Sequence, residues 1–350
     1  MRALVVVLNK NNAEGLRAAL ESLVRQSGVD VCVDYDVLVV DGWSADASEE
    51  VVKGFSSRFG CVEFVRQRFP GGVGQARVEA VRRALDLGYD VVVWGDSENV
   101  YDEDYLREIL GCINPASGCD VCSGSTYVRQ GFWGGFFYWY HTYHHLFKMV
   151  SRRHAPGNNK AVKAALYRTN IYPAISRSDD FFFSLAVRGN AEFCHCSGAR
   201  LTTSLPDSLK GVIAWQRSRV RGLVEGALLK GWGLPPDFLP WFLFMASPPL
   251  LTLTHILRLL GIDTFLQPVV WFLTAAFTAG AVYMMVRLEL LARERYLGYR
   301  PMQGFLGFVG MYLHSIFTTY YTLKYTITLR RRVSELKELN RAVRSYFRFP

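Results

Sequence analysis

Two acidic residues, Asp96 and Glu98, stand just after a short apolar run at residues 91–94. A run of this length, rich in β-branched residues, is typical of a strand buried on both faces of a parallel sheet. Ligand sites in such sheets lie at the carboxyl ends of the strands, so both carboxylates would meet there. Together they could hold one divalent cation, Mg²⁺ or Mn²⁺, which prefers oxygen ligands and bridges to a diphosphate. Alone, an Asp-x-Glu is more often a solvated acidic turn.

Other carboxylates stand at comparable places. Asp41 follows a second apolar run, residues 36–40, and would lie at the same edge of the sheet. Asp179 and Asp180 precede a short helical pattern, and either could accept a proton from a bound hydroxyl group. On its own, an acidic pair at that place is more often a helix N-terminal cap.

Two further stretches could hold phosphate. The guanidinium group of Arg219 could bind diphosphate oxygens in a bidentate manner, and Gln216 precedes it by one helical turn. That spacing alone is more often one face of an amphipathic helix. The glycine-rich loop at 69–74 would let backbone N–H groups approach a phosphate.

The elements that must position these residues alternate along the first hundred positions. We predict strands and helices in strict alternation: strands at 3–8, 36–40, 62–65 and 91–94, and helices at 14–26, 48–59 and 75–87. This order with short loops predicts an α/β fold with a mostly parallel sheet flanked by helices. A dinucleotide-dependent dehydrogenase is not expected, because no Gly-x-Gly-x-x-Gly follows the first strand.

The order of the motifs resembles the family 2 glycosyltransferases, which have the GT-A nucleotide-diphospho-sugar transferase fold. Four stretches carry this resemblance: Asn11-Asn12-Ala13-Glu14-Gly15-Leu16, Val39-Val40-Asp41-Gly42-Trp43-Ser44-Ala45-Asp46, Gly74-Gln75-Ala76-Arg77 and Asp96-Ser97-Glu98. The last stands in the place of the family's Asp-x-Asp metal motif. Two later stretches are similar to the family's acceptor loop and strand: residues 155–160 and 165–168.

The resemblance continues toward the middle of the chain. Asp179 and Asp180 fall where the family carries an acidic pair. Residues 215–222 resemble the Gln-x-x-Arg-Trp motif of membrane glycan synthases of the cellulose synthase type, with Val220 in place of the tryptophan. Because that ring would ordinarily help hold an acceptor sugar, the change argues against processive chain elongation.

The resemblance implies an inverting glycosyltransferase that uses a nucleotide sugar and a divalent cation. Asp41 would bind the base, while Asn11 and Arg77 would bind the nucleotide and its phosphates. Asp96 and Glu98 would hold Mn²⁺ or Mg²⁺ and so neutralise the leaving diphosphate.

Transfer to the acceptor would involve the later motifs. Asp180, with Asp179 beside it, would act as general base on the acceptor hydroxyl. Gln216 and Arg219 would contact the nucleotide sugar. GDP-mannose is the expected donor and a polyprenyl-linked carrier the expected acceptor. A polysaccharide synthase that uses a UDP-sugar and a catalytically inactive carbohydrate-binding subunit are the alternatives.

The chain divides into a catalytic domain, residues 1–230, a membrane region, residues 236–330, and a basic amphipathic tail, residues 331–350. Within the first, 131–150 and 205–230 are expected to be interfacial helices, the former because its many aromatic side chains carry polar tips. His141, His144 and His145 share a helical face there, but without a carboxylate motif we expect no metal site. The tail would lie on anionic lipid or pack on the catalytic domain.

Two stretches of the membrane region, 238–260 and 264–286, have the roughly 20 apolar residues that cross a bilayer. A third, 304–329, is also long enough. The chain starts without a signal peptide, so the catalytic domain of this multi-pass membrane protein is expected in the cytosol. A third crossing would then place the arginines at 330–332 outside, against the positive-inside tendency. Crossing, re-entrant and interfacial placements therefore all stay open for the third stretch.

The net charge indicates the class of partner, and the cysteine spacing indicates the state of the cysteines. The formal net charge of +9 suits an anionic membrane face or a phosphorylated substrate. No nucleic-acid partner is expected, because no basic cluster is interleaved with aromatic residues. The seven cysteines include no paired CxxC motifs for zinc, so buried thiols are expected, with disulfides as the alternative in a thermophile.

Overall fold

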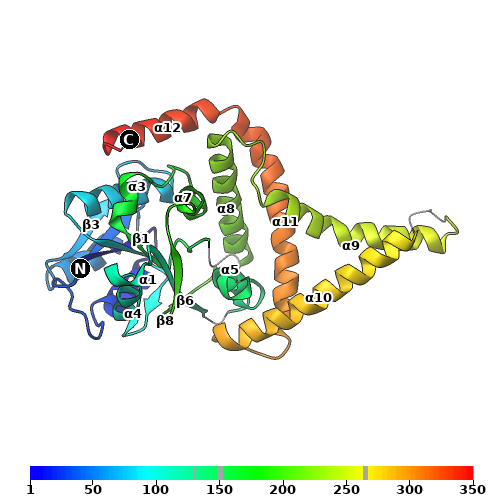
Figure 1. Ribbon diagram of the computed structural model, residues 1–350, viewed down its shortest axis with the longest axis horizontal. Helices are drawn as coiled ribbons and strands as arrows, with labels where there is room; N and C mark the ends of the chain where they lie inside the picture. Colours follow the sequence, from blue (N-terminus) through cyan, green and yellow to red (C-terminus); the bar gives the residue numbers. More distant parts are fainter. Residues whose placement is uncertain (130, 148–152, 263–266, 350) are drawn as a thin grey trace.

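The computed structural model describes residues 1–129, 131–147, 153–262 and 267–349. Figure 1 shows an α/β domain next to a set of long helices, and a helical hairpin that projects away from both. The chain ends in a helix that returns to the α/β domain. This arrangement agrees with the predicted order of a catalytic domain followed by a helical region.

The described residues form an eight-stranded sheet in the order β3-β2-β1-β4-β7-β6-β8-β5. Its strands are β1 (Ala3–Asn9), β2 (Tyr35–Asp41), β3 (Val62–Arg66), β4 (Val91–Asp96), β5 (Val100–Tyr101), β6 (Val121–Val128), β7 (Lys160–Lys163) and β8 (Phe193–Thr203). The predicted strands correspond to β1 to β4, which pair in parallel. The sheet as a whole is mixed, because β7 runs antiparallel to both β4 and β6.

Helices cover both faces of this sheet. They are α1 (Ala13–Leu23), α2 (Ser48–Ser56), α3 (Val73–Asp86), α4 (Tyr105–Cys112) and α7 (Asp179–Val187), with the 3-10 helices η1 (Pro115–Ser117) and η2 (Ala164–Arg168). Successive residues of β1 point to opposite faces: Val5 packs in a core with α1, α2 and α4, whereas Val6 packs in a core with α3, η2 and α7. Residues 165–168, expected to be a strand, lie in η2, and the strand is the β7 segment just before it.

Helix α11 is the centre of the helical region. It packs against α5 (Gly134–Leu146), α8 (Leu209–Leu229), α9 (Phe238–Leu259) and α10 (Gln267–Arg295), and itself spans Gln303–Arg330. Only α9 and α10, among the described residues, are long and apolar enough to cross a membrane. The expected span at 304–329 corresponds to α11, which buries a polar stripe against its neighbours instead. Positions 264–266 of the second expected span lie outside the described residues.

Helix α5 occupies most of the aromatic stretch at 131–150. Phe137, Tyr138 and Trp139 are buried in a core with α8, α10 and α11. Positions 148–150 lie outside the described residues. Lipid contact for this stretch and for 205–230 stays a prediction, but much of the α5 surface is covered by protein.

The tail forms helix α12 (Val333–Tyr346), which packs on the catalytic domain. Val343 and Phe347 are buried in the core that contains α3 and α7. The side chain of Asn340 accepts the Ala174 N–H (2.8 Å) and donates to the Ala174 carbonyl (3.1 Å). Of the two placements left open for the tail, the structure therefore supports packing on the domain.

Six of the cysteines form disulfides, contrary to the expectation of buried thiols. The pairs are Cys32–Cys61, Cys112–Cys196 and Cys119–Cys194, with Cα–Cα distances of 5.3, 6.1 and 5.9 Å. Cys122 is buried and free. Spacing along the chain did not indicate these pairs, because their partners lie 29, 84 and 75 positions apart and meet only in the folded sheet.

Candidate active site

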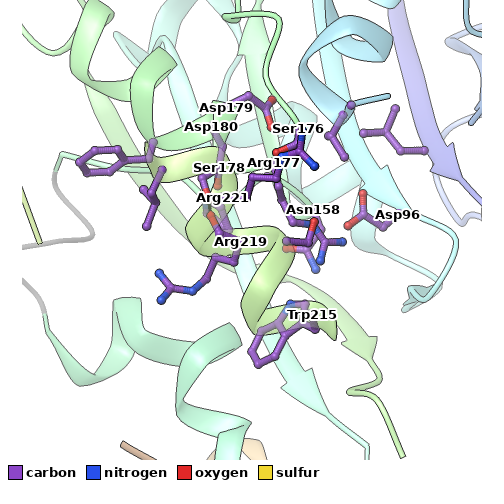
Figure 2. Close-up of a pocket in the computed structure, with 18 of the residues that line it drawn as sticks. Asp96, Asn158, Ser176, Arg177, Ser178, Asp179, Asp180, Trp215, Arg219 and Arg221 are labelled. Carbon is purple, nitrogen blue, oxygen red and sulfur yellow. Dashed lines mark hydrogen bonds between the residues drawn. The ribbon is translucent and has the colours of Figure 1, made fainter. Parts of the chain in front are cut away.

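A cavity of about 1350 Å³ opens at the carboxyl ends of β1 and β4. It extends between the α/β domain and helices α5, α8 and α9. Most of the predicted site residues meet on its wall: Arg77, Asp96, Glu98, Asp179, Asp180 and Arg219. Figure 2 shows residues of the 176–180 segment facing Asp96 on one side and Arg219 on the other.

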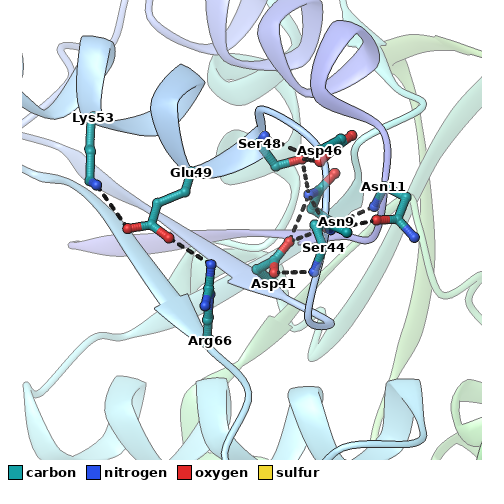
Figure 3. A network of polar contacts seen from close by, with 10 residues as sticks. Asn9, Asn11, Asp41, Ser44, Asp46, Ser48, Glu49, Lys53 and Arg66 are labelled. Carbon is teal, nitrogen blue, oxygen red and sulfur yellow. Dashed lines mark hydrogen bonds and ion pairs between the residues drawn. The ribbon is translucent and has the colours of Figure 1, made fainter.

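The loop after β2 is organised by the buried carboxylate of Asp41 (Figure 3). Asp41 accepts hydrogen bonds from Asn9 Nδ2 (2.9 Å), from the Ser44 hydroxyl (2.6 Å) and from the Ser44 N–H (2.8 Å). The Asn11 side chain accepts the Ala45 N–H (2.8 Å) in the same loop. Both predicted nucleotide residues therefore build the loop in this structure, and direct contact of Asp41 or Asn11 with a nucleotide stays a prediction.

Other residues of this region face the cavity. Asn9, Lys10, Gly42 and Gln67 line it beside the loop that Asp41 organises. The sequence offered a partial signal for Asn9, since it is the polar residue that ends the first strand. Asn9, Lys10 and Gly42 are thus neighbours of the predicted residues along the chain, whereas Gln67 comes from the segment after β3.

Asp96 and Glu98 lie together at the end of β4. Burial, and after it the negative charge of Glu98, raises the pKa of Asp96 to about 6, while Arg77 acts in the opposite direction. Within the part of the chain that the structure describes, neither carboxylate forms a hydrogen bond or an ion pair. The positive charges of Arg77 and Arg177 act on Asp96 only at longer range.

This donor set fits a divalent cation. Carboxylate oxygens are ligands that Mg²⁺ and Mn²⁺ prefer, and a bound cation would relieve the repulsion between Asp96 and Glu98. No group of three or more His, Cys, Asp or Glu residues is placed to hold a metal within the described ranges. Water or a bound diphosphate would therefore have to complete the coordination.

Arg77 lies between the Asp96 end of the cavity and the acidic pair, Asp179 and Asp180. Its Nε lies 2.8 Å from the Asp179 carboxylate, and its Nη2 donates to the Gly157 carbonyl (2.8 Å). Both members of the ion pair are buried, and burial raises the pKa of Asp179 to about 6 against the effect of Arg77. Arg77 Nη1 makes no hydrogen bond with the described residues and is a free buried donor. Asp179 thus holds Arg77 in place.

Asp180 differs from Asp179 because it faces the cavity with several cationic groups around it. Burial raises its pKa, but His154, Lys160 and Arg77 outweigh burial and lower the pKa below the ordinary value. His154 Nε2 lies 3.7 Å from the Asp180 carboxylate, yet burial lowers the pKa of His154 to about 4. At neutral pH, Arg77, together with Lys160 while it is protonated, therefore keeps Asp180 ionised and able to accept a proton.

The glycine-rich loop has a packing role in this structure, and its contact with phosphate stays a prediction. The N–H groups of Val73 and Gly74 donate to the Ser176 and Ile175 carbonyls, each at 3.1 Å, so these donors are not free for phosphate. A Cβ at Gly74 would lie 2.0 Å from the Pro173 carbonyl oxygen. The loop therefore uses glycine to bring α3 close to the segment that leads to Asp179.

Gln216 and Arg219 are buried on α8 and form a hydrogen bond between Arg219 Nε and Gln216 Oε1 (3.3 Å). Helix α8 also supports the segment before Asp179, because a Cβ at Gly222 would lie 1.9 Å from the Arg177 carbonyl oxygen. Val220 is buried against α11 and does not line the cavity. On the same helix, Trp215 is the aromatic residue that lines the cavity.

Comparison with known proteins agrees with this geometry. Residues 4–172 match the profile of Glycosyl transferase family 2. This part of the chain is a glycosyltransferase family 2 domain. It contains the predicted motifs as far as the end of η2, whereas the acidic pair and Arg219 lie beyond it.

Curated relatives share the glycosyltransferase domain. A PGL/p-HBAD biosynthesis glycosyltransferase of Mycobacterium tuberculosis is 27% identical over 137 residues, which are 38% of this chain and 50% of the relative. An undecaprenyl-phosphate mannosyltransferase of Micrococcus luteus is 28% identical over 131 residues, which are 37% of this chain and 51% of the relative. The chain thus spans about half the length of the curated relatives it matches.

A solved structure shares the fold over a longer stretch. It is a mannosyltransferase from Pyrobaculum calidifontis in complex with GDP-Man and Mn²⁺, with a TM-score of 0.57 and 18% sequence identity. The match covers 91% of this chain and 87% of the other. The predicted GT-A fold is confirmed.

Proposed function

We propose that the protein is a metal-dependent, inverting glycosyltransferase that moves mannose from GDP-mannose to a polyprenyl-linked acceptor at the membrane surface. The observation that carries this proposal is the convergence on one cavity wall of Asp96 and Glu98, the Arg77–Asp179 pair and Asp180. A family 2 glycosyltransferase domain supports the class of reaction.

Each polar group has a place in the reaction. Asp96 and Glu98 would hold Mn²⁺ or Mg²⁺, which stabilises the charge of the departing nucleoside diphosphate. Arg77, fixed by Asp179, offers its free Nη1 as a donor to the phosphates. Asp180 accepts the proton of the acceptor hydroxyl while the new glycosidic bond forms and the bond to the diphosphate breaks.

The choice of donor and acceptor rests on the relatives and on the helical region. One curated relative is named an undecaprenyl-phosphate mannosyltransferase, and the P. calidifontis enzyme was solved with GDP-Man. Helices α9 and α10 are apolar enough to place the cavity close to a bilayer. Together these observations favour GDP-mannose over a UDP-sugar and a lipid carrier over a soluble acceptor.

A transfer assay tests the proposal directly. Purified full-length protein would be incubated with Mn²⁺ and radiolabelled GDP-mannose or UDP-glucose, with polyprenyl phosphate or a polyprenyl-linked sugar as acceptor. We expect labelled lipid from GDP-mannose only, and loss of the product when EDTA is added. Label from UDP-glucose alone would reverse the choice of donor, and absence of any lipid product would contradict the proposal.

Asp180→Asn is the matched variant, because the amide keeps the shape and cannot accept the proton. For an acceptor hydroxyl we expect turnover to fall by roughly 10²- to 10⁴-fold, the usual contribution of a general base. A phosphate acceptor is already ionised and needs no base, so the size of the loss also distinguishes the two acceptors. Unchanged transfer to a hydroxyl acceptor would show that Asp180 is not the base.

A further inference from the structure

Helix α11 contacts Gln216 and Arg219 on α8, and both helices lie beyond the family 2 domain. Gln216 Nε2 lies 2.9 Å from His314 Nδ1, and because an amide nitrogen only donates, the histidine nitrogen accepts. Arg219 Nη2 donates to Thr318 Oγ1 (2.5 Å). With the hydrogen bond between Arg219 and Gln216, these contacts form one buried network of four side chains.

The spacing of the four residues explains how the network forms. Gln216 and Arg219 are one turn apart on α8, and His314 and Thr318 are one turn apart on α11, so each pair lies on one helix face. The two helices pack along each other, which places the pairs opposite one another. Since the guanidinium group is planar with fixed donor directions, two anchors fix its orientation.

Side chains from α5 and from the start of α9 also contact His314 and Arg219. The His314 ring meets Trp139 of α5 and Trp241 of α9 edge-on, with centroid distances of 5.0 and 4.7 Å. Asp237, just before α9, lies 3.8 Å from Arg219 Nη1. Its distance and partial exposure make Asp237 the weaker contact, whereas Thr318 is fully buried. Thr318 and Asp237 therefore contact the Arg219 guanidinium from the segment that follows α8. Gln216 on α8 and the Tyr140 ring of α5, whose centroid lies 5.8 Å from the guanidinium carbon, are its other neighbours.

We propose that Thr318 and His314 are positioning residues that hold Arg219 in the orientation in which it meets the diphosphate of the nucleotide sugar. This inference rests on the proposed function and extends the site to a helix beyond the family 2 domain. Arg219 lines the cavity, so a change in its orientation alters the donors presented there. Misplacement of a positioned group by 1 Å can slow a reaction by roughly 10²-fold.

Three variants of full-length protein separate positioning from packing. Thr318→Val keeps the shape and loses the hydroxyl, whereas Thr318→Ser keeps the hydroxyl. Thr319→Val is the matched control, because Thr319 is also buried on α11 but its hydroxyl has no hydrogen-bond partner among the described residues. The measurements are kcat and KM for GDP-mannose, thermal midpoint, and calorimetric affinity for GDP with Mn²⁺.

We expect Thr318→Val to lower kcat by about tenfold or more and to weaken GDP binding, with Thr318→Ser close to wild type and Thr319→Val unchanged. Equal kcat in Thr318→Val and wild type would overturn the inference and leave the proposed function intact. An equal loss in the Ser and Val variants would also overturn it, since packing would then be the cause. A wild-type protein that neither transfers nor binds GDP would overturn both.

A second pair of variants covers the case in which Thr318→Val does not fold. His314→Asn keeps an acceptor near the position of Nδ1, whereas His314→Phe keeps the ring against Trp139 and Trp241 and loses the acceptor. We expect kcat to be lower in the Phe variant than in the Asn variant. The reverse order would show that ring packing, and not the hydrogen bond to Gln216, is what the site requires.

Discussion

Glu98 is one methylene longer than the aspartate at the same place in the family's Asp-x-Asp motif. Its carboxylate forms no hydrogen bond or ion pair with the described residues. We therefore predict that Glu98→Asp keeps metal-dependent transfer. Glu98→Ala should raise the Mn²⁺ concentration for half-maximal activity by more than about tenfold, because even outer-shell partners contribute that much to metal affinity. A Mn²⁺ titration of activity measures the change, with the exposed Glu103→Ala as control. If Glu98→Ala has no effect, Asp96 or another group carries the ion.

Lys160 is a buried lysine whose ammonium group has no hydrogen-bond partner in the described chain. It lies over the rings of Tyr172 and Phe183, at 5.2 and 5.5 Å from their centroids. Burial, with Arg77 as the next cause, lowers the pKa of Lys160 to about 7. While protonated, Lys160 lowers the pKa of Asp180, so it helps to keep this carboxylate ionised.

We predict that Lys160→Met shifts the acidic limb of the kcat/KM profile toward higher pH. Removing the cation raises the pKa of Asp180, so the carboxylate takes up its proton, and activity falls, at a higher pH than in wild type. Lys163→Met is the control on the same strand, because Lys163 pairs with Asp120 away from the cavity. An acidic limb at the same pH in Lys160→Met and wild type would contradict the electrostatic role.

At the scale of elements, the sequence predicts what depends on local pattern. The sequence correctly predicts the apolar runs of β1 to β4 and the carboxylates of Asp41 and Asp96 that end β2 and β4. A buried parallel strand has a period and a length that a sequence displays. The sequence of strand β7, which contains Lys160, shows neither this period nor this length. Its place between β4 and β6 arises from long-range antiparallel pairing.

Contacts between residues far apart in the sequence also limit how much of the site can be predicted. Asp96, Arg77 and Asp180 follow or belong to recognisable motifs, and the structure brings them to one cavity. His314 gave no signal, because its partner Gln216 is 98 positions away and nothing local marks a buried histidine as an acceptor. Asp41 shows the opposite case: its motif is clear, but its carboxylate is fully buried and organises a loop.

At the scale of the whole molecule, the packing of the tail limits the membrane topologies open to the chain. Helix α12 is fastened to the catalytic domain through Asn340 and through the ring of Tyr346, which meets Phe69 at a centroid distance of 5.4 Å. In a membrane, this packing would place both ends of the helical region on the same side of the bilayer. We therefore expect an even number of crossings, with α9 and α10 as the two candidate spans.

We predict that the hairpin of α9 and α10 enters the bilayer while α11 and the C-terminus stay on the side of the catalytic domain. This placement also keeps the arginines at 330–332 on the cytosolic side, as the positive-inside tendency requires. A protease site added after residue 350 should be cut only when sealed spheroplasts are permeabilised, as should one added before residue 1. A C-terminal site cut in intact spheroplasts would instead establish a third crossing, and α12 could then not be packed on the catalytic domain.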